Sequence, residues 1–214
     1  RMRKFIPMLA MVLSLGGTAA FAQDALTSDI LALKKSWAEA NYGIPDKGKR
    51  ADAMQALQPR AKALVDKYPQ RAEPLIWEGI VYSGYADAHG GLGALGAAKK
   101  ARDLFEQAIK IDERALEGSA LGSLGVLYAK VPGFPVGFGN EDKARALLQR
   151  AIAINPDGID SNYFLGEFLA NHKDVPGGIR HLEKSVAAPD RPGQELADQG
   201  RRKQATALLA SLKD

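Results

Sequence analysis

The stretch that decides the fold runs from residue 159 to residue 187 and reads IDSNYFLGEFLANHKDVPGGIRHLEKSVA. Its pattern is carried by Leu165, Gly166 and Leu169 on one predicted helix, and by Gly178, Leu182 and Ser185 on a second. Small residues recur at such positions where paired helices approach closely, because a larger side chain would collide with the neighbouring helix. The stretch therefore predicts a packed pair of α-helices.

The same pattern occurs twice more, earlier in the chain. The first copy carries Gly79, Tyr82, Ala101, Phe105, Ala108 and Ile109, and the second carries Leu124, Gly125, Tyr128, Ala144, Leu148, Ala151, Ile152 and Pro156. This is the pattern of tetratricopeptide repeats (TPRs), whose arrays usually serve as docking surfaces. We expect an all-α, TPR-like helical-repeat solenoid of antiparallel helix pairs.

Two Pro/Gly-rich insertions lengthen the repeats. The matching glycines are 46 and 41 residues apart, against a usual TPR period of about 34. The excess falls at 86–96 and 131–140. The first insertion contains Gly91-Leu92-Gly93-Ala94-Leu95-Gly96, whose sequence matches the dinucleotide-binding fingerprint. However, a predicted helical segment precedes it, whereas a true fingerprint follows a strand. We expect a flexible, close-packing turn there.

The amino end has the pattern of a signal peptide. Arg3 and Lys4 precede an apolar run over 5–15, and Ala20-Phe21-Ala22 forms an Ala-x-Ala cleavage site. We expect 1–22 to be removed after Ala22 and the mature chain to reach a bacterial periplasm. The absence of cysteine excludes disulfides and a lipoprotein anchor, so we expect a soluble mature chain without an integral membrane segment.

Charge excludes two partner classes. Three of the 29 basic residues (Arg1, Arg3 and Lys4) lie in the predicted signal peptide, which leaves 26 basic against 25 acidic residues. A nearly neutral mature chain has no general attraction for nucleic acid or for an anionic membrane.

Residues 23–214 are expected to form a single TPR-like α-solenoid. The predicted units are a degenerate amino-terminal helix pair (27–70), repeat 1 (71–115), repeat 2 (116–158), repeat 3 (159–193) and a carboxy-terminal capping helix (195–212). Pro59 should kink the second helix or divide it into two. The capping helix is expected to bury Leu196, Leu208, Leu209 and Leu212.

The first helix of each repeat should line the concave wall of the array. In repeat 3 this wall comprises Asp160, Tyr163, Glu167, Ala170 and Asn171. The equivalent positions are Glu73, Ile76 and Ile80 in repeat 1, and Ser119, Gly122 and Val126 in repeat 2. Glu167 beside Tyr163 could receive an amine or hydroxyl of a ligand; the alternative is a salt bridge to a neighbouring Lys or Arg.

The 131–140 insertion has no charge and carries Phe134 and Phe138 before Asn140. Exposed apolar patches reduce solubility unless they serve a role. Either both Phe side chains fold back and fill a gap in the stack, or they line a pocket or a partner-binding face.

No catalytic or metal site is expected. His89, His172 and His181 are scattered over different elements, without the spacing of a helical metal site. We expect His172 and His181 to face solvent. Carboxylates fall mostly on solvated helix faces, so we expect a non-enzyme without a cofactor.

The chain resembles the T-component family associated with tripartite ATP-independent periplasmic (TRAP) transporters. The resemblance rests on the segments IWEGI (76–80), VPGFPVGFG (131–139), INPDGID (154–160), NYFLGE (162–167) and APDRPG (188–193). It implies a helical repeat protein of the cell envelope that associates with a periplasmic solute-binding protein and can form homo-oligomers with pores. Trp77 and Asn140, within these segments, join the candidate binding residues.

Three functional hypotheses follow. The first is a periplasmic scaffold that binds a protein partner, such as the solute-binding component of a TRAP-type system, through its concave face and the 131–140 loop. The second is a carrier of a small apolar or amphipathic solute in a concave pocket or oligomeric pore. The third is an envelope-assembly factor.

Overall fold

The computed structural model describes the backbone of residues 16–213 and the side chains of residues 23–91 and 93–212. This part of the chain contains nine α-helices, one short 3₁₀ helix and no strand, so the expected all-α class is confirmed. The elements are α1 (Gly16–Gly43), α2 (Lys47–Lys67), α3 (Ala72–His89), α4 (Gly91–Asp112), the 3₁₀ helix η1 (Ala115–Gly118), α5 (Ser119–Lys130), α6 (Glu141–Ile154), α7 (Ile159–Asn171), α8 (Val175–Ala187) and α9 (Glu195–Lys213).

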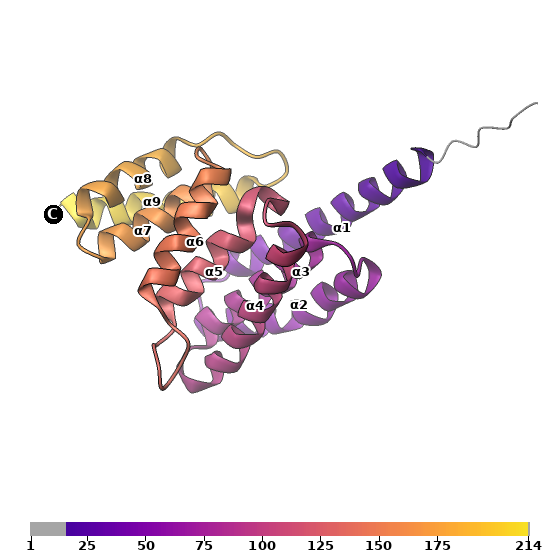
Figure 1. Cartoon of the computed structure of the whole chain (residues 1–214), viewed down its shortest axis with the longest axis horizontal. Coiled ribbons are helices and arrows are strands. Elements are labelled where there is room, and N and C mark those ends of the chain that lie inside the picture. The colour runs from indigo at the N-terminus through magenta and orange to yellow at the C-terminus, as the bar shows by residue number, and fades with distance from the viewer. Residues whose placement is uncertain (1–15, 214) are drawn as a thin grey trace, which may run out of the picture.

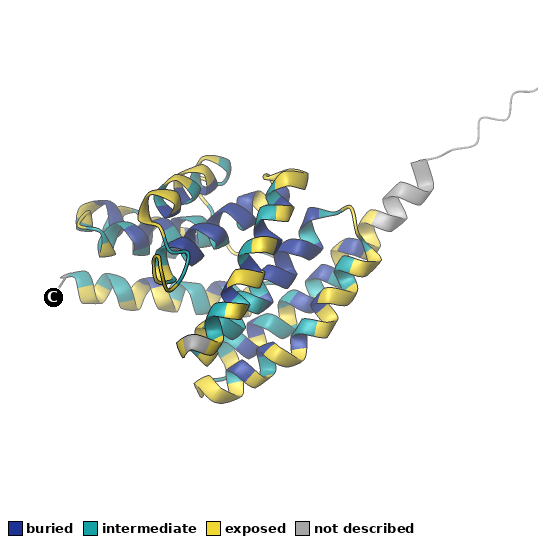
Figure 2. Ribbon diagram, turned by 60° about the horizontal axis from the view of Figure 1, so that its bottom comes forward, coloured by how far each residue is buried: buried dark blue, intermediate teal, exposed yellow. Residues whose placement is uncertain are grey.

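The helices pack as consecutive hairpins. α3 packs on α4, α5 on α6 and α7 on α8, while α2 packs on α3 and each hairpin contacts the next. Stacking of the hairpins produces a curved array that runs from α1 to α8 (Figure 1). Buried residues gather where neighbouring helices face each other, and exposed residues follow the outer surfaces (Figure 2).

Each repeat is held at the same point by a glycine and a large apolar side chain. A Cβ atom added at Gly79 would lie 2.6 Å from Phe105, one at Gly125 would lie 2.8 Å from Leu148, and one at Gly166 would lie 2.9 Å from Leu182. Phe105, Leu148 and Leu182 are almost completely buried. The predicted close approach at these glycines is confirmed.

The first insertion differs from the expectation. α3 continues to His89, and α4 begins at Gly91 after the single residue Gly90, whose φ of 66° only glycine adopts readily. The flexible turn expected over residues 91–96 is therefore wrong, because these residues form the first turns of α4. The long repeat arises from longer helices.

Two further expectations concern the amino-terminal helices. Pro59 lies inside the continuous helix α2, so the alternative of two shorter helices is wrong. Residues 1–15 of the predicted signal peptide lie outside the described residues. α1 begins at Gly16 and passes through the predicted cleavage point after Ala22, and the first described core side chain is Leu26.

The last helix closes the array. α9 packs on α8 and α7 and also contacts α1, although these helices lie at opposite ends of the chain. Ala205 and Asp198 are buried in it, while Leu208, Leu209 and Leu212 pack against the adjacent core. Leu196 was expected to be buried, but its side chain remains 42% exposed. The inward face of α9 is thus partly polar. None of the described helices combines the length and apolar character that a membrane span requires.

The Gly166–Leu182 contact can be tested by Gly166→Ala. The new methyl group would lie 2.9 Å from Leu182 Cγ and 3.0 Å from its backbone N, so the helices must move apart. We expect the free energy of unfolding to fall by about 1–3 kcal/mol, measured by urea denaturation. Gly96→Ala is the control, because nothing lies within 4 Å of a Cβ there, and it should stabilise α4 by about 0.5–1 kcal/mol. Equal effects of the two variants would contradict the close-approach argument.

Candidate functional site

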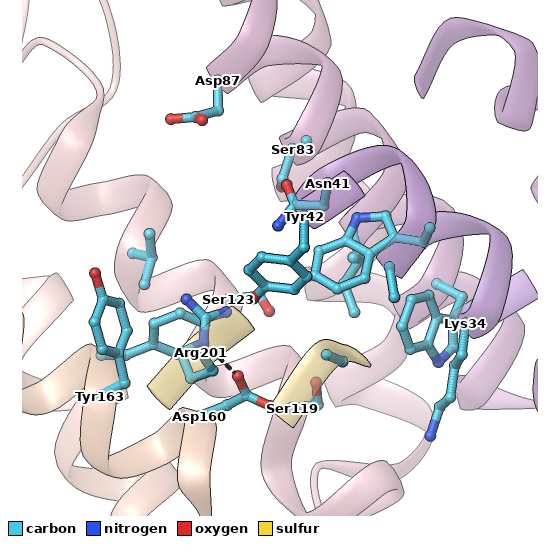
Figure 3. Close-up of a pocket in the computed structure, with 18 of the residues that line it drawn as sticks. Lys34, Asn41, Tyr42, Ser83, Asp87, Ser119, Ser123, Asp160, Tyr163 and Arg201 are labelled. Carbon is cyan, nitrogen blue, oxygen red and sulfur yellow. Dashed lines mark hydrogen bonds and ion pairs between the residues drawn. The ribbon is translucent and has the colours of Figure 1, made fainter. Parts of the chain in front are cut away.

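The concave side of the array encloses one large cavity of about 1230 Å³. Its walls come from α1, α3, α4, α5, α7 and α9, together with the 131–140 loop and the turn before α9. Of the concave positions predicted from sequence, Ile80, Ser119, Val126, Asp160 and Tyr163 line it, and so does Trp77. Figure 3 shows Tyr42 near its centre, between Tyr163 and Lys34.

Six predicted concave positions do not line the cavity: Glu73, Ile76, Gly122 and Ala170, and also Glu167 and Asn171. Ile76 is completely buried in the core, and Gly122 is buried with Phe164 next to it, 3.4 Å from where a Cβ would stand. Glu73 is half-buried and paired with Arg71. The wall therefore comprises fewer positions of each first helix than expected.

An aromatic cluster forms the wall at α1 and α3. The Trp37 ring meets Tyr42 and Trp77 edge to face, with ring centroids 5.7 and 5.8 Å apart. The Nε1 atoms of both tryptophans and Ser83 Oγ are buried and have no hydrogen-bond partner among the described residues. An unpaired buried donor costs about 1–3 kcal/mol. This wall is thus large and apolar, and its unpaired donors are closed off from solvent.

A network of charges forms the opposite wall. Arg201 Nε donates to Asp160 Oδ1 at 2.7 Å, and Arg191 Nη1 donates to Asp160 Oδ2 at 2.8 Å. Arg191 also holds the fully buried Asp198 through its backbone N (2.7 Å) and its guanidinium (2.6 Å). The dashed contact between Asp160 and Arg201 is visible in Figure 3. These contacts connect α7 to α9 across the cavity wall.

The network shifts the ionisation of its members. Burial raises the pKa of Asp160, but Arg201 and Arg191 lower it more, so it lies below the usual value. The guanidinium of Arg201 also lies over the rings of Tyr163 and Phe164, 4.6 and 4.7 Å from their centroids. Burial, with Glu167 adding to it, raises the pKa of Tyr163. Asp160 is therefore held as a carboxylate between two cations.

Glu167 and Asn171 line a separate depression of about 130 Å³ rather than the large cavity. Glu167 pairs with Lys130 at 3.1 Å and accepts a hydrogen bond from the Tyr163 hydroxyl at 3.2 Å. Its salt-bridge alternative is confirmed. The structure thus places Asp160 and Tyr163 together in the cavity, and Glu167 and Asn171 beside it.

The two phenylalanines of the 131–140 loop have different surroundings. Phe138 packs edge to face on Tyr128, with centroids 5.5 Å apart, and Arg102 lies over its ring. Phe134 is 93% exposed. Asn140 caps α6 by accepting a hydrogen bond from Lys143 N at 2.8 Å. The gap-filling interpretation therefore holds for Phe138, and Phe134 remains available to a partner.

The two carboxy-terminal histidines were expected to face solvent, and this expectation is wrong. His172 stacks on Phe168 with centroids 4.1 Å apart, and its Nδ1 lies 2.7 Å from Phe168 O. His181 Nδ1 lies 2.9 Å from Asn162 Oδ1, and burial lowers the pKa of His181. No group of three or more His, Asp or Glu in the described part of the chain is arranged to hold a metal.

Sequence reasoning missed four of the polar residues that shape the cavity: Lys34, Tyr42, Arg191 and Arg201. They lie on α1, on α9 and in the turn before it, which the sequence assigned to a degenerate amino-terminal helix pair, a capping helix and the end of repeat 3. These residues share a site only because the two ends of the array are in contact. No local spacing in the sequence indicates that contact.

Comparisons with known proteins identify the fold class. No protein-family model matches the sequence, and no curated protein matches it. Among solved structures, the thermophilic TPR protein TTC0263 of Thermus thermophilus matches with a TM-score of 0.53 and 20% identity, over 89% of this chain and 95% of that one. This likeness shows that the chain has a TPR-type fold.

Two other structures are more distant. MamA matches with a TM-score of 0.45 and 21% identity, over 79% of this chain and 92% of that one. Yeast Tom70 matches with a TM-score of 0.46 and 15% identity, over 94% of this chain and 44% of Tom70.

The Asp160 network makes a prediction about acid stability. Asp160→Asn keeps the shape but removes the charge, and we expect a loss of about 1–3 kcal/mol in the free energy of unfolding at pH 7. A carboxylate with a depressed pKa stabilises fully above its unfolded value of about 3.9 and loses this effect as the pH falls through the folded-state value. The variant should therefore converge on the wild type at low pH.

The control is Asp190→Asn, in which an exposed carboxylate paired with Arg202 is removed. Its effect should stay within about 0.5 kcal/mol at every pH. Denaturant titrations between pH 3 and pH 7 measure both. An equal loss of unfolding free energy in both variants would show that the contacts of Asp160 stabilise the protein no more than a surface ion pair does.

Proposed function

We propose that the protein is an interaction scaffold that binds a protein partner through its concave side and the 131–140 loop. The observation that carries this proposal is Phe134, a large aromatic side chain that is 93% exposed at the tip of a loop whose base is anchored. Anchored aromatic side chains are typical hot spots of protein interfaces, because little conformational entropy is lost when they are buried.

The loop is held close to the cavity. Phe138 and the bond from Asn140 N to Tyr128 O, at 2.9 Å, attach it to α5, and Val136 reaches the cavity rim while remaining 56% exposed. A partner that covers Phe134 would also cover Val136. This arrangement favours a partner that contacts the loop and the mouth of the cavity together.

The finer proposal concerns the identity of that partner. The predicted signal peptide and the resemblance to TRAP T-components support a periplasmic location and a solute-binding protein as partner. In this setting the scaffold would present its cavity next to the binding site of the partner. No enzymatic activity is proposed.

A second candidate function is a carrier of a small apolar or amphipathic solute. It is favoured by the size of the cavity, since about 1230 Å³ exceeds the 300–1000 Å³ typical of ligand pockets, and by the contact of α9 with α1 that closes one side. The two functions are compatible, because Phe134 is not part of the cavity wall.

Site-specific photo-crosslinking tests the scaffold. Phe134→benzoylphenylalanine, expressed with its full amino end in a periplasm that contains the solute-binding protein, should form a crosslink identified by mass spectrometry as that protein. Ile111→benzoylphenylalanine is the control, since Ile111 is another exposed apolar residue (47%), on α4. Equal crosslinking at both positions, or none at Phe134, would refute the docking role.

A binding measurement on a loop variant gives the contribution of Phe134 to the affinity for the partner. Phe134→Ala should weaken affinity for the captured partner about tenfold or more, because hot-spot aromatics cost at least about 2 kcal/mol on truncation. The thermal stability of Phe134→Ala should not change, since the side chain is exposed.

Native mass spectrometry of the exported protein tests the location and the second function. An amino terminus at Gln23 supports export, and an additional small-molecule mass supports the carrier.

A further inference from the structure

Lys34 is a half-buried cation on the wall of the cavity without a protein anion of its own. None of the ion pairs formed by the described residues includes Lys34. Its described contact is with the Trp77 ring, whose centroid lies 5.6 Å from Nζ. Burial, followed by repulsion from Arg191, lowers the pKa of Lys34. The protein therefore does not fully offset the cost of burying this charge.

The nearby carboxylates are already occupied by other groups. Asp160 bridges Arg191 and Arg201, and Asp198 is held by Arg191. Glu117 also attracts Lys34, but it is exposed and accepts a hydrogen bond from Asn155 at 2.7 Å. The three carboxylates that attract Lys34 are thus engaged elsewhere, and none of them forms an ion pair with it.

Apolar side chains form much of the cavity wall that Lys34 belongs to. They include Trp37, Trp77, Ile80, Leu116 and Val126. A ligand suited to this space has one anionic end and a long apolar body.

We propose that the cavity binds amphipathic monoanions, with a carboxylate at Lys34 and an apolar chain along Trp77, Ile80 and Val126. This inference rests on the second candidate function, the small-solute carrier, and names its ligand class. The carboxylate supplies the ion-pair partner that Lys34 lacks, and the charge-assisted contact is strong because the site is partly desolvated. The apolar chain adds about 0.8 kcal/mol for each buried methylene group.

Three probes with the same ten-carbon chain separate the head group from the body: decanoate, 1-decanol and decyltrimethylammonium. Isothermal titration calorimetry below micellar concentrations, with the exported protein, should rank decanoate tightest and the cation weakest. Lys34→Met should weaken decanoate binding about tenfold or more and leave 1-decanol unchanged. Lys34→Arg should retain most of the affinity for decanoate.

Lys99→Met is the matched control, because Lys99 is an exposed lysine outside the cavity wall, and its decanoate affinity should equal that of the wild type. Thermal melting of each variant confirms folding. Equal affinity for decanoate and 1-decanol, or no effect of Lys34→Met, would overturn the head-group assignment and leave the carrier function standing. If none of the three probes binds, both are refuted, and the scaffold is still judged separately by crosslinking at Phe134.

Discussion

The rest of the structure depends on the close approach of two helices at a glycine. Gly79, Gly125 and Gly166 each receive one large side chain from the second helix of the pair, and none has room for a methyl group. Interiors are packed as densely as organic crystals, so such a contact fixes the position of one helix on another. Because the contact recurs in each repeat, the hairpins stack with similar geometry and the array curves. The concave side that lines the cavity is a consequence of this repetition.

The contact between α9 and α1 closes one side of the cavity. A Cβ at Gly200 would lie 2.3 Å from the Tyr42 ring, so α9 lies directly against α1 there. On its other side α9 places Arg201 against Asp160 and over Tyr163. Asp198 is fully buried and bonded to Arg191, which fixes the turn before α9. A helix that would otherwise only cap the stack thereby supplies part of the binding wall.

The sequence predicts the repeated elements well because each repeat is specified locally. Glycine and apolar positions at helical spacing identified α3 to α8, and the placement of Asp160 and Tyr163 on the concave side followed from the register. The prediction of a turn in the first insertion was wrong because a glycine-rich sequence is typical of turns. In the structure α3 extends to His89 and α4 begins at Gly91, with only Gly90 between them. The roles of Lys34 and Arg201 could not be predicted, since they depend on a contact between residues more than 150 positions apart.

The cavity and the 131–140 loop share part of one wall. Val136 belongs both to the exposed loop that carries Phe134 and to the cavity rim, and Lys34 and Asp160 lie on walls built from opposite ends of the chain. If a ligand touched both walls, it would stabilise the contact between α1 and α9 by mass action. The proposed protein partner at Phe134 would contact the rim of the same cavity. If occupancy of the cavity changed the affinity for this partner, reciprocity of linkage would require the partner to alter ligand affinity by the same factor.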